Sequence, residues 1–213
     1  MEVKLKNKKW VSHHIMTNKR PHLIVIAGPN GAGKSTTAPS LLKGTLEVTE
    51  FVNADVIAQG LSAFKPEMTA FQAGRIMLER LYYLAKNRLD FAFESTLASK
   101  TFAFWITGLR NKGYDFRLVF LWLPGEDFAV SRVEERVHMG GHNVPGETIR
   151  RRYYAGLYNF FALYRPLADA WVFYDNSGGE PRLVASGEQE QEIVVFDQTL
   201  WHTIEDTYGR RKK

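Results

Sequence analysis

The residues from Gly28 to Ser35, GPNGAGKS, have the types and spacing needed to bind a polyphosphate. They match G-x-x-x-x-G-K-[ST] at every fixed position. Glycines let backbone N–H groups approach phosphate oxygens, the lysine reaches the β- and γ-phosphates, and the serine hydroxyl coordinates Mg²⁺. We therefore expect a catalytic Lys34, Mg²⁺ on Ser35, and nucleotide contacts from Gly28, Pro29, Asn30, Gly31, Ala32, Gly33, Lys34, Ser35 and Thr36.

Two acidic residues follow apolar segments that are expected to be strands. Asp55 comes just after Phe51-Val-Asn53, and Glu94 ends the segment Phe91-Ala-Phe-Glu94. A carboxylate beside an acceptor hydroxyl can orient it and take its proton during phosphoryl transfer, which makes Asp55 the candidate base. Glu94 is expected to bind substrate hydroxyls or to hold Mg²⁺ through water. The alternatives are a helix N-cap for Asp55 and a buried ion pair for Glu94.

Arginines later in the chain have the spacing of a lid over the γ-phosphate. Arg132 and Arg136 share one face of an expected helix, and Arg150–Arg152 open the next one, beyond a Gly-Gly break at 140–141. Converging cations stabilise the charge that develops during phosphoryl transfer. We expect catalytic roles for Arg132 and for a second arginine, either Arg136 or one of Arg150–Arg152. The alternative is a solvated helix whose arginines pair with neighbouring acids.

These residues must be held by an alternating series of strands and helices. Strands are expected at 22–27, 47–53, 89–93, 116–123 and 171–174, and helices at 34–42, 66–88, 102–112, 126–138 and 147–164. A hairpin at 182–196 and a helix at 200–208 complete the chain. This order predicts an α/β fold, a P-loop kinase-like parallel sheet with helices on both faces, an arginine lid and a C-terminal β-hairpin. We expect residues 1–213 to form a single domain.

Composition excludes several other classes of protein. There is no cysteine, and the longest purely apolar run, 118–123, is far shorter than the roughly 20 residues that cross a bilayer. We therefore expect a cytoplasmic protein that does not bind membranes. The net charge is +5, but residues 1–20 carry +5 and residues 209–213 carry +4, which leaves −4 for the rest. The positive charge thus lies in two terminal arms, and nucleic acid is not the expected partner.

The ordered set of motifs resembles the zeta toxin family of P-loop kinases, and in particular its bacterial branch with Gly-Gly-His-x-Val-Pro. The resemblance spans roughly residues 22 to 178 and rests on Gly28–Ser35, Asn53-Ala-Asp55, Glu94-Ser-Thr96, Arg132-Val-Glu-Glu-Arg136, Gly140–Pro145, Arg150-Arg-Arg152-Tyr and Asp175-Asn-Ser177. It implies transfer of the ATP γ-phosphate to the 3′-hydroxyl of UDP-N-acetylglucosamine. It further implies Asp55 as the base, Glu94 and Thr96 as further substrate contacts, Arg132 as the first γ-phosphate arginine, and a separate helical antitoxin as partner.

Two other functions stay open at this point. The basic termini would also suit a polynucleotide 5′-hydroxyl kinase, and the phosphate loop would suit an ATP-binding module that acts through a protein partner. A GTPase is excluded because no base-reading N-K-x-D segment occurs. Asn176, after the fifth expected strand, could contact adenine or serve as a turn residue.

Overall fold

A computed structural model of the chain describes residues 20–42, 48–62, 66–141, 143–189 and 191–209. Within this part of the chain one sheet has the strand order β2-β3-β1-β4-β5-β6-β7. The first five strands in that order run parallel to one another. The strand β6 pairs antiparallel with β5, and β7 pairs antiparallel with β6. Their bounds are β1 His22–Ala27, β2 Phe51–Val52, β3 Phe91–Ser95, β4 Asp115–Trp122, β5 Ala170–Asp175, β6 Arg182–Glu188 and β7 Val194–Val195. The expected parallel sheet and terminal hairpin are confirmed.

The expected helices are observed with local differences, and α3 and the short α8 are additional. The helices are α2 Lys34–Leu41, α3 Ala54–Leu61, α4 Ala70–Lys86, α5 Thr101–Asn111, α6 Glu126–His138, α7 Gly146–Asn159, α8 Arg165–Leu167 and α9 Gln198–Ile204. A 3₁₀ turn, η2 Pro66–Thr69, precedes α4, and π-helical turns, η3 Phe160–Tyr164 and η4 Glu205–Gly209, follow α7 and α9. The strand expected at 47–53 is shorter, and residue 47 lies outside the described part. The helix expected over 147–164 changes to π geometry at residue 160.

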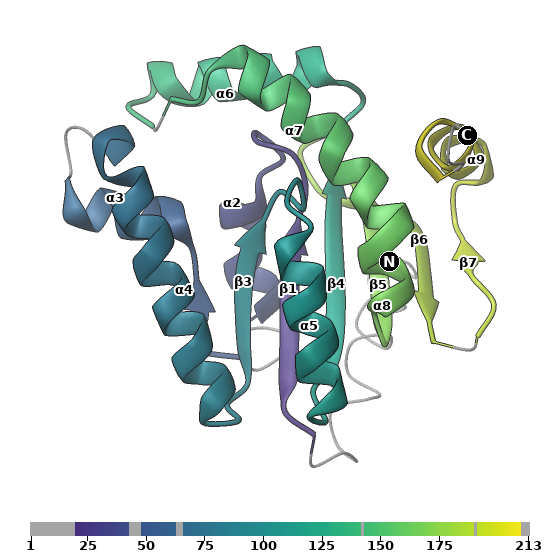
Figure 1. Ribbon diagram of the computed structural model, residues 1–213. Helices are drawn as coiled ribbons and strands as arrows, with labels where there is room; N and C mark the ends of the chain where they lie inside the picture. The colour runs from purple at the N-terminus through teal and green to yellow at the C-terminus, as the bar shows by residue number, and fades with distance from the viewer. Residues whose placement is uncertain (1–19, 43–47, 63–65, 142, 190, 210–213) are drawn as a thin grey trace.

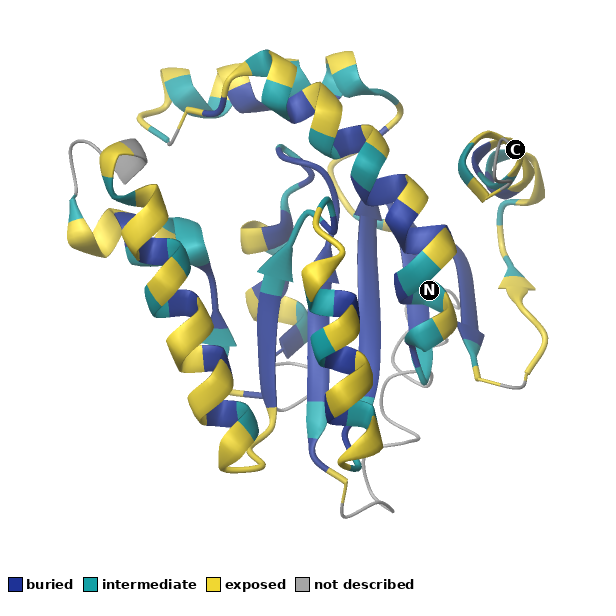
Figure 2. Ribbon diagram, in the orientation of Figure 1, coloured by how far each residue is buried: buried dark blue, intermediate teal, exposed yellow. Residues whose placement is uncertain are grey.

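The strand β1 is apolar throughout because both faces of the sheet are covered. Leu23, Val25 and Ala27 belong to the large core that includes residues of α4, α5 and α7. Ile24 and Ile26, which point to the opposite face, pack with Ala38 and Leu42 at α2. Figure 2 shows the central strands buried between partly exposed helices. Helices on both faces, as expected for a buried parallel sheet, are therefore confirmed.

The carboxyl ends of the five parallel strands meet at one edge of the sheet. Figure 1 shows α6 and α7 above this edge and α3 beside it. Ligands of open α/β sheets bind outside this edge, so it is where the candidate residues must gather. None of the helices in the described ranges is long and apolar enough to cross a membrane.

Candidate functional site

Glu94 forms the centre of a hydrogen-bonded cluster at the carboxyl end of β3. The Ser35 hydroxyl donates to Glu94 Oε2 over 2.7 Å, and Asn53 Nδ2 donates to the same oxygen over 2.6 Å and to Ser35 Oγ over 3.1 Å. The second carboxylate oxygen, Oε1, lies 3.6 Å from Lys34 Nζ. The register that pairs Ile26 with Glu94 brings β3 beside the strand that feeds the phosphate loop. The expected proximity of Lys34, Ser35 and Glu94 is thus observed.

Lys34 is a buried cation with only 6% of its surface exposed. Its ammonium group donates a 2.8 Å hydrogen bond to the Pro29 carbonyl. Burial lowers the pKa of Lys34, while the charges of Glu94 and Asp55 raise it and that of Arg136 lowers it. Asp55 and Arg136 therefore lie within electrostatic range of Lys34. A desolvated cation in this position is suited to a polyanionic ligand, which would replace its lost hydration.

The N-cap of α3 is Asn53 and not Asp55. Asn53 Oδ1 accepts hydrogen bonds from the backbone N–H groups of Asp55 and Val56, at 2.8 and 3.3 Å. Asp55 instead lies in the first turn of α3, where a negative charge is favoured by the helix dipole. Among the described residues its carboxylate has no hydrogen bond and no ion pair, and it is partly exposed. The alternative of an N-cap for Asp55 is therefore wrong, and its carboxylate is available to a ligand.

Asn53 belongs to the motif Asn53-Ala-Asp55, but the sequence analysis predicted no role for it. Its Oδ1 caps α3, while its Nδ2 orients both Ser35 and Glu94. An asparagine directly after a strand and before a helix was the available signal, since asparagine is a preferred N-cap. Its amide points toward Glu94 on the adjacent strand β3, and this direction depends on long-range strand register, for which there is no local sequence signal.

The phosphate loop packs closely against α6 and the turn after β5. Gly31 adopts a left-handed φ of 79°, and a Cβ there would lie 2.9 Å from Arg132 Cβ and 2.8 Å from the Ala129 carbonyl. Asn176 Nδ2 donates to the Ala32 carbonyl over 2.7 Å, so this asparagine supports the loop. Asn30 is buried, and its Oδ1 has no hydrogen-bond partner in the described structure. A glycine at 31 is required for α6 to come this close.

The two arginines of α6 lie in different places. Arg132 donates to the backbone carbonyls of Asn176 and Ser177, at 3.0 and 3.2 Å, and its guanidinium lies 5.3 Å from the centre of the Phe128 ring. Arg136 lies in the last turn of α6, within electrostatic range of Lys34. Of these two arginines, Arg136 is the one whose charge acts on Lys34. Arg132 is instead hydrogen-bonded to the loop after β5.

The end of α6 positions Arg136. Gly140 donates to the Val137 carbonyl and Gly141 to the Arg136 carbonyl, both over 2.9 Å, the bond pattern of a Schellman cap. A side chain at residue 141 would collide with Arg136, since a Cβ there would be 2.5 Å from Arg136 Cγ. The Gly-Gly break therefore ends the helix and leaves room for the arginine. The next residue, His142, lies outside the described part of the chain.

The three consecutive arginines at the start of α7 also separate. Arg150 is exposed and pairs with the Asp127 carboxylate, and Arg151 is exposed. Arg152 is only partly exposed. Burial lowers the pKa of Arg152, the charge of Arg151 lowers it further, and the charge of Asp55 raises it. Of the three, Arg152 is thus the one that is partly buried and within electrostatic range of Asp55.

Thr96 lies at the point where α7 touches the chain after β3. A Cβ on Gly156 would be 2.3 Å from the Thr96 carbonyl oxygen, so helix and loop are in direct contact there. One group is formed by Lys34, Ser35, Asp55, Glu94 and Arg136. Thr96 follows two residues after Glu94 in the chain. In the described ranges, no group of three His, Cys, Asp or Glu residues could hold a metal by itself. Ser35 and Glu94 offer the hard oxygen ligands that Mg²⁺ prefers, and Mg²⁺ usually completes its shell with phosphates and water.

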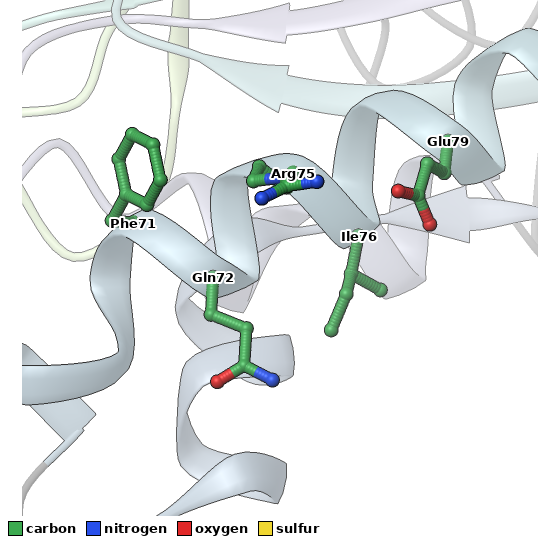
Figure 3. Close-up of a pocket in the computed structure, with 5 residues that line it drawn as sticks. All are labelled: Phe71, Gln72, Arg75, Ile76 and Glu79. Atoms are coloured by element: carbon green, nitrogen blue, oxygen red, sulfur yellow. The ribbon is translucent and has the colours of Figure 1, made fainter.

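A separate pocket of about 340 Å³ lies along α4 (Figure 3). Its lining residues are Phe71, Gln72, Arg75, Ile76 and Glu79, and none of them belongs to the group around Lys34. Phe71 is 82% exposed, so this pocket is a shallow feature of the helix surface.

The sequence of this chain is similar to those of known proteins. The family model described as zeta toxin matches residues 7–189. An uncharacterized protein of Haemophilus influenzae is 26% identical over 149 residues, which is 70% of this chain and 99% of the relative.

Solved structures give the same picture of the fold. The PezAT chromosomal toxin-antitoxin system of Streptococcus pneumoniae includes a chain that is 16% identical, with a TM-score of 0.58 over 90% of this chain and 82% of that one. A chain of the AvrRxo1-ORF1:-ORF2 structure with ATP is 17% identical, with a TM-score of 0.66 over 95% of this chain and 70% of that one. The chain therefore shares the P-loop kinase-like fold of these structures.

Proposed function

This chain belongs to the zeta toxin family, and we propose that it is an ATP- and Mg²⁺-dependent kinase acting on the 3′-hydroxyl of UDP-N-acetylglucosamine or a closely related nucleotide sugar. The observation that carries the proposal is the carboxylate of Asp55. It has no hydrogen bond or ion pair among the described residues, yet lies within electrostatic range of the buried Lys34. A partly exposed, unbonded carboxylate beside a phosphate-binding lysine is suited to a proton acceptor.

In the proposed reaction the acceptor hydroxyl attacks the γ-phosphorus of ATP. A new P–O bond to the sugar forms, the bond between the γ-phosphorus and the β–γ bridging oxygen breaks, and the hydroxyl proton passes to Asp55. Lys34 and Arg136 stabilise the charge on the transferring phosphoryl group. Arg132, the expected first lid arginine, is hydrogen-bonded to the carbonyls of Asn176 and Ser177. It can stabilise the phosphoryl group only after these hydrogen bonds break.

The metal is expected beside the hydroxyl of Ser35. Its neighbour Glu94 accepts hydrogen bonds from both Ser35 and Asn53, so one carboxylate orients the hydroxyl that would ligate Mg²⁺. When bound, Mg²⁺ would neutralise charge on the β- and γ-phosphates. Glu94 and Thr96, at the end of β3, would contact the acceptor or the metal-bound water.

The similar structures support a protein partner as part of the same proposal. PezAT is described as a toxin-antitoxin system, and AvrRxo1-ORF1 is seen in complex with ORF2. We therefore expect a helical antitoxin to bind this chain. Expression of the chain alone is expected to slow growth of the host, and co-expression of the partner is expected to restore it.

The direct test is phosphoryl transfer from γ-labelled ATP to a panel of UDP-sugars and to an oligonucleotide with a free 5′-hydroxyl. We expect labelled UDP-N-acetylglucosamine, and a loss of about 10²–10⁴ in rate for Asp55→Asn with ATP binding unchanged. Glu79→Gln, an exposed carboxyl on α4, serves as the control and is expected to retain the wild-type rate.

Two outcomes would contradict the proposal. Transfer to the oligonucleotide alone would favour the polynucleotide kinase, whose supporting basic arms lie mostly outside the described residues. Growth inhibition that survives Asp55→Asn but not Lys34→Ala would instead favour an ATP-binding module that acts through its partner.

A further inference from the structure

The helix α4 carries large apolar side chains on the face that is turned away from the core. Its buried face consists of Ala73, Met77, Leu81 and Leu84. The opposite face carries Phe71, Leu78 and Tyr82, which are 82%, 41% and 56% exposed. Positions 71, 75, 78 and 82 follow one another at intervals of four, three and four residues, which is the spacing of the contact positions in a coiled coil. Large apolar side chains gathered on an exposed face mark an interaction surface.

Two opposite charges lie in the same row and have no partner within the described ranges. Arg75 and Glu79 are exposed and one helical turn apart, and neither forms an ion pair or a hydrogen bond there. Figure 3 shows them following Phe71 along one side of the helix. An arginine four residues before a glutamate is the less favourable order for a pair within one helix. By contrast, Arg80 on the same helix pairs with Glu50 at 2.7 Å. The name α4 face is used below for Phe71, Arg75, Leu78, Glu79 and Tyr82.

We propose that the α4 face binds the same face of a second copy of this chain, with the two helices antiparallel. A two-fold axis that crosses α4 at the level of Met77 places Arg75 of each copy level with Glu79 of the other, so two ion pairs form across the interface. The same axis places Phe71 of each copy level with Tyr83 of the other and keeps Leu78 near the centre. A parallel arrangement would place each charge level with its like, which is unfavourable. The α4 face is thus complementary to itself in both charge and apolar surface.

This inference does not depend on the proposed kinase function, because the α4 face shares no residue with the group around Lys34. A single pair of helices buries little surface, so the dimer is expected to be weak and reversible. Sedimentation of the full chain across the micromolar range is expected to show a monomer–dimer equilibrium. A chain that stays monomeric throughout this range would leave the α4 face to a different partner and overturns the proposal.

Removal of one apolar side chain tests which surface forms the dimer. Phe71→Ala is expected to raise the dissociation constant of the dimer about 10–100-fold, the usual effect of losing an aromatic side chain at the centre of an interface. Phe196→Ala is the matched control, since it removes an exposed phenylalanine that follows β7 at the other edge of the sheet. This control is expected to keep the wild-type dissociation constant. Equal weakening by both substitutions, or by neither, overturns the proposal.

Charge reversal tests the antiparallel pairing itself. Arg75→Glu leaves two acids on the α4 face, and Glu79→Arg leaves two arginines, so each variant alone is expected to dimerise about 10–100-fold more weakly. An equimolar mixture of the two variants is expected to dimerise about as well as the wild type, because every arginine then meets an acid. This recovery requires both variants to be folded. Lys112→Glu makes the same change of charge at an exposed residue after α5 and is expected to have no effect. A mixture that stays monomeric, or single variants that dimerise normally, contradict the proposed pairing.

Discussion

The two ends of the parallel sheet both carry charged clusters, but they differ in how completely those charges are paired within the described part of the chain. At that end Asp115 lies 3.3 Å from the ring of His22 and 3.1 Å from Arg117. Asp169 accepts from two nitrogens of Arg110, at 2.8 and 3.0 Å, and from the backbone N–H of Phe116. Each carboxylate there is matched by donors of this chain, as expected for structural ion pairs.

The carboxyl end is different because some of its charges have no partner of their own. Lys34 is buried with Glu94 at 3.6 Å, while Asp55 and Arg152 have neither a hydrogen bond nor an ion pair in the described structure. Charges that are partly desolvated and unpaired cost stability unless a ligand completes them. The difference suggests that substitution of a charge should lower activity at one end of the sheet and stability at the other.

The largest effect is expected for Lys34→Met, which keeps most of the side-chain volume and removes the charge. Because Lys34 stabilises the transferring phosphoryl group in the proposed mechanism, kcat is expected to fall about 10³-fold. Because burial disfavours its charged form, the melting temperature is expected to stay the same or rise. Steady-state kinetics and calorimetry on the same sample measure both quantities. A large fall in melting temperature would show that Lys34 also stabilises the fold. That result would contradict the proposed difference between the two ends of the sheet.

The fold could be predicted from the sequence, but the arrangement of the candidate site residues could not, and their roles stay predictions. The apolar run of β1 and the glycine pattern of the phosphate loop are local signals, and both elements form where expected. The register that joins Glu94 to Ser35 and Asn53 is set by long-range strand pairing, so a local pattern could not give it. The separation of Arg132 from Arg136, and of Arg152 from Arg150 and Arg151, likewise depends on how α6 and α7 pack.

A smaller effect, on stability alone, is expected for Asp169→Ala at the amino end. The substitution leaves the partly buried Arg110 without its main carboxylate and the Phe116 N–H without an acceptor. We expect a loss of about 3 kcal/mol in unfolding free energy, or about 6–12 °C in melting temperature for a chain of this size. The kcat of the remaining folded protein should match the wild type. Thermal unfolding and activity at a temperature well below the transition test both points, and a selective loss of kcat would contradict the structural assignment.

The smallest effect is a pH dependence that originates at Asp115. Burial alone would raise its pKa, but the close contact with His22 and the charge of Arg117 lower it to about 2. Since the pKa is lower in the folded state than the ordinary value of 3.8, this carboxylate stabilises the fold above pH 4, and the contribution, about 2 kcal/mol, is lost as the pH falls from 4 to 2. Denaturant unfolding across this pH range measures the free energy of unfolding, and Asp115→Asn should flatten its dependence on pH.

Asp197 is the control, because the N–H of Leu200 and then Arg182 lower its pKa near the surface, where solvent screens the effect. If Asp197→Asn flattened the dependence of unfolding free energy on pH as much as Asp115→Asn, the cluster of Asp115, His22 and Arg117 would not be the source of this pH dependence.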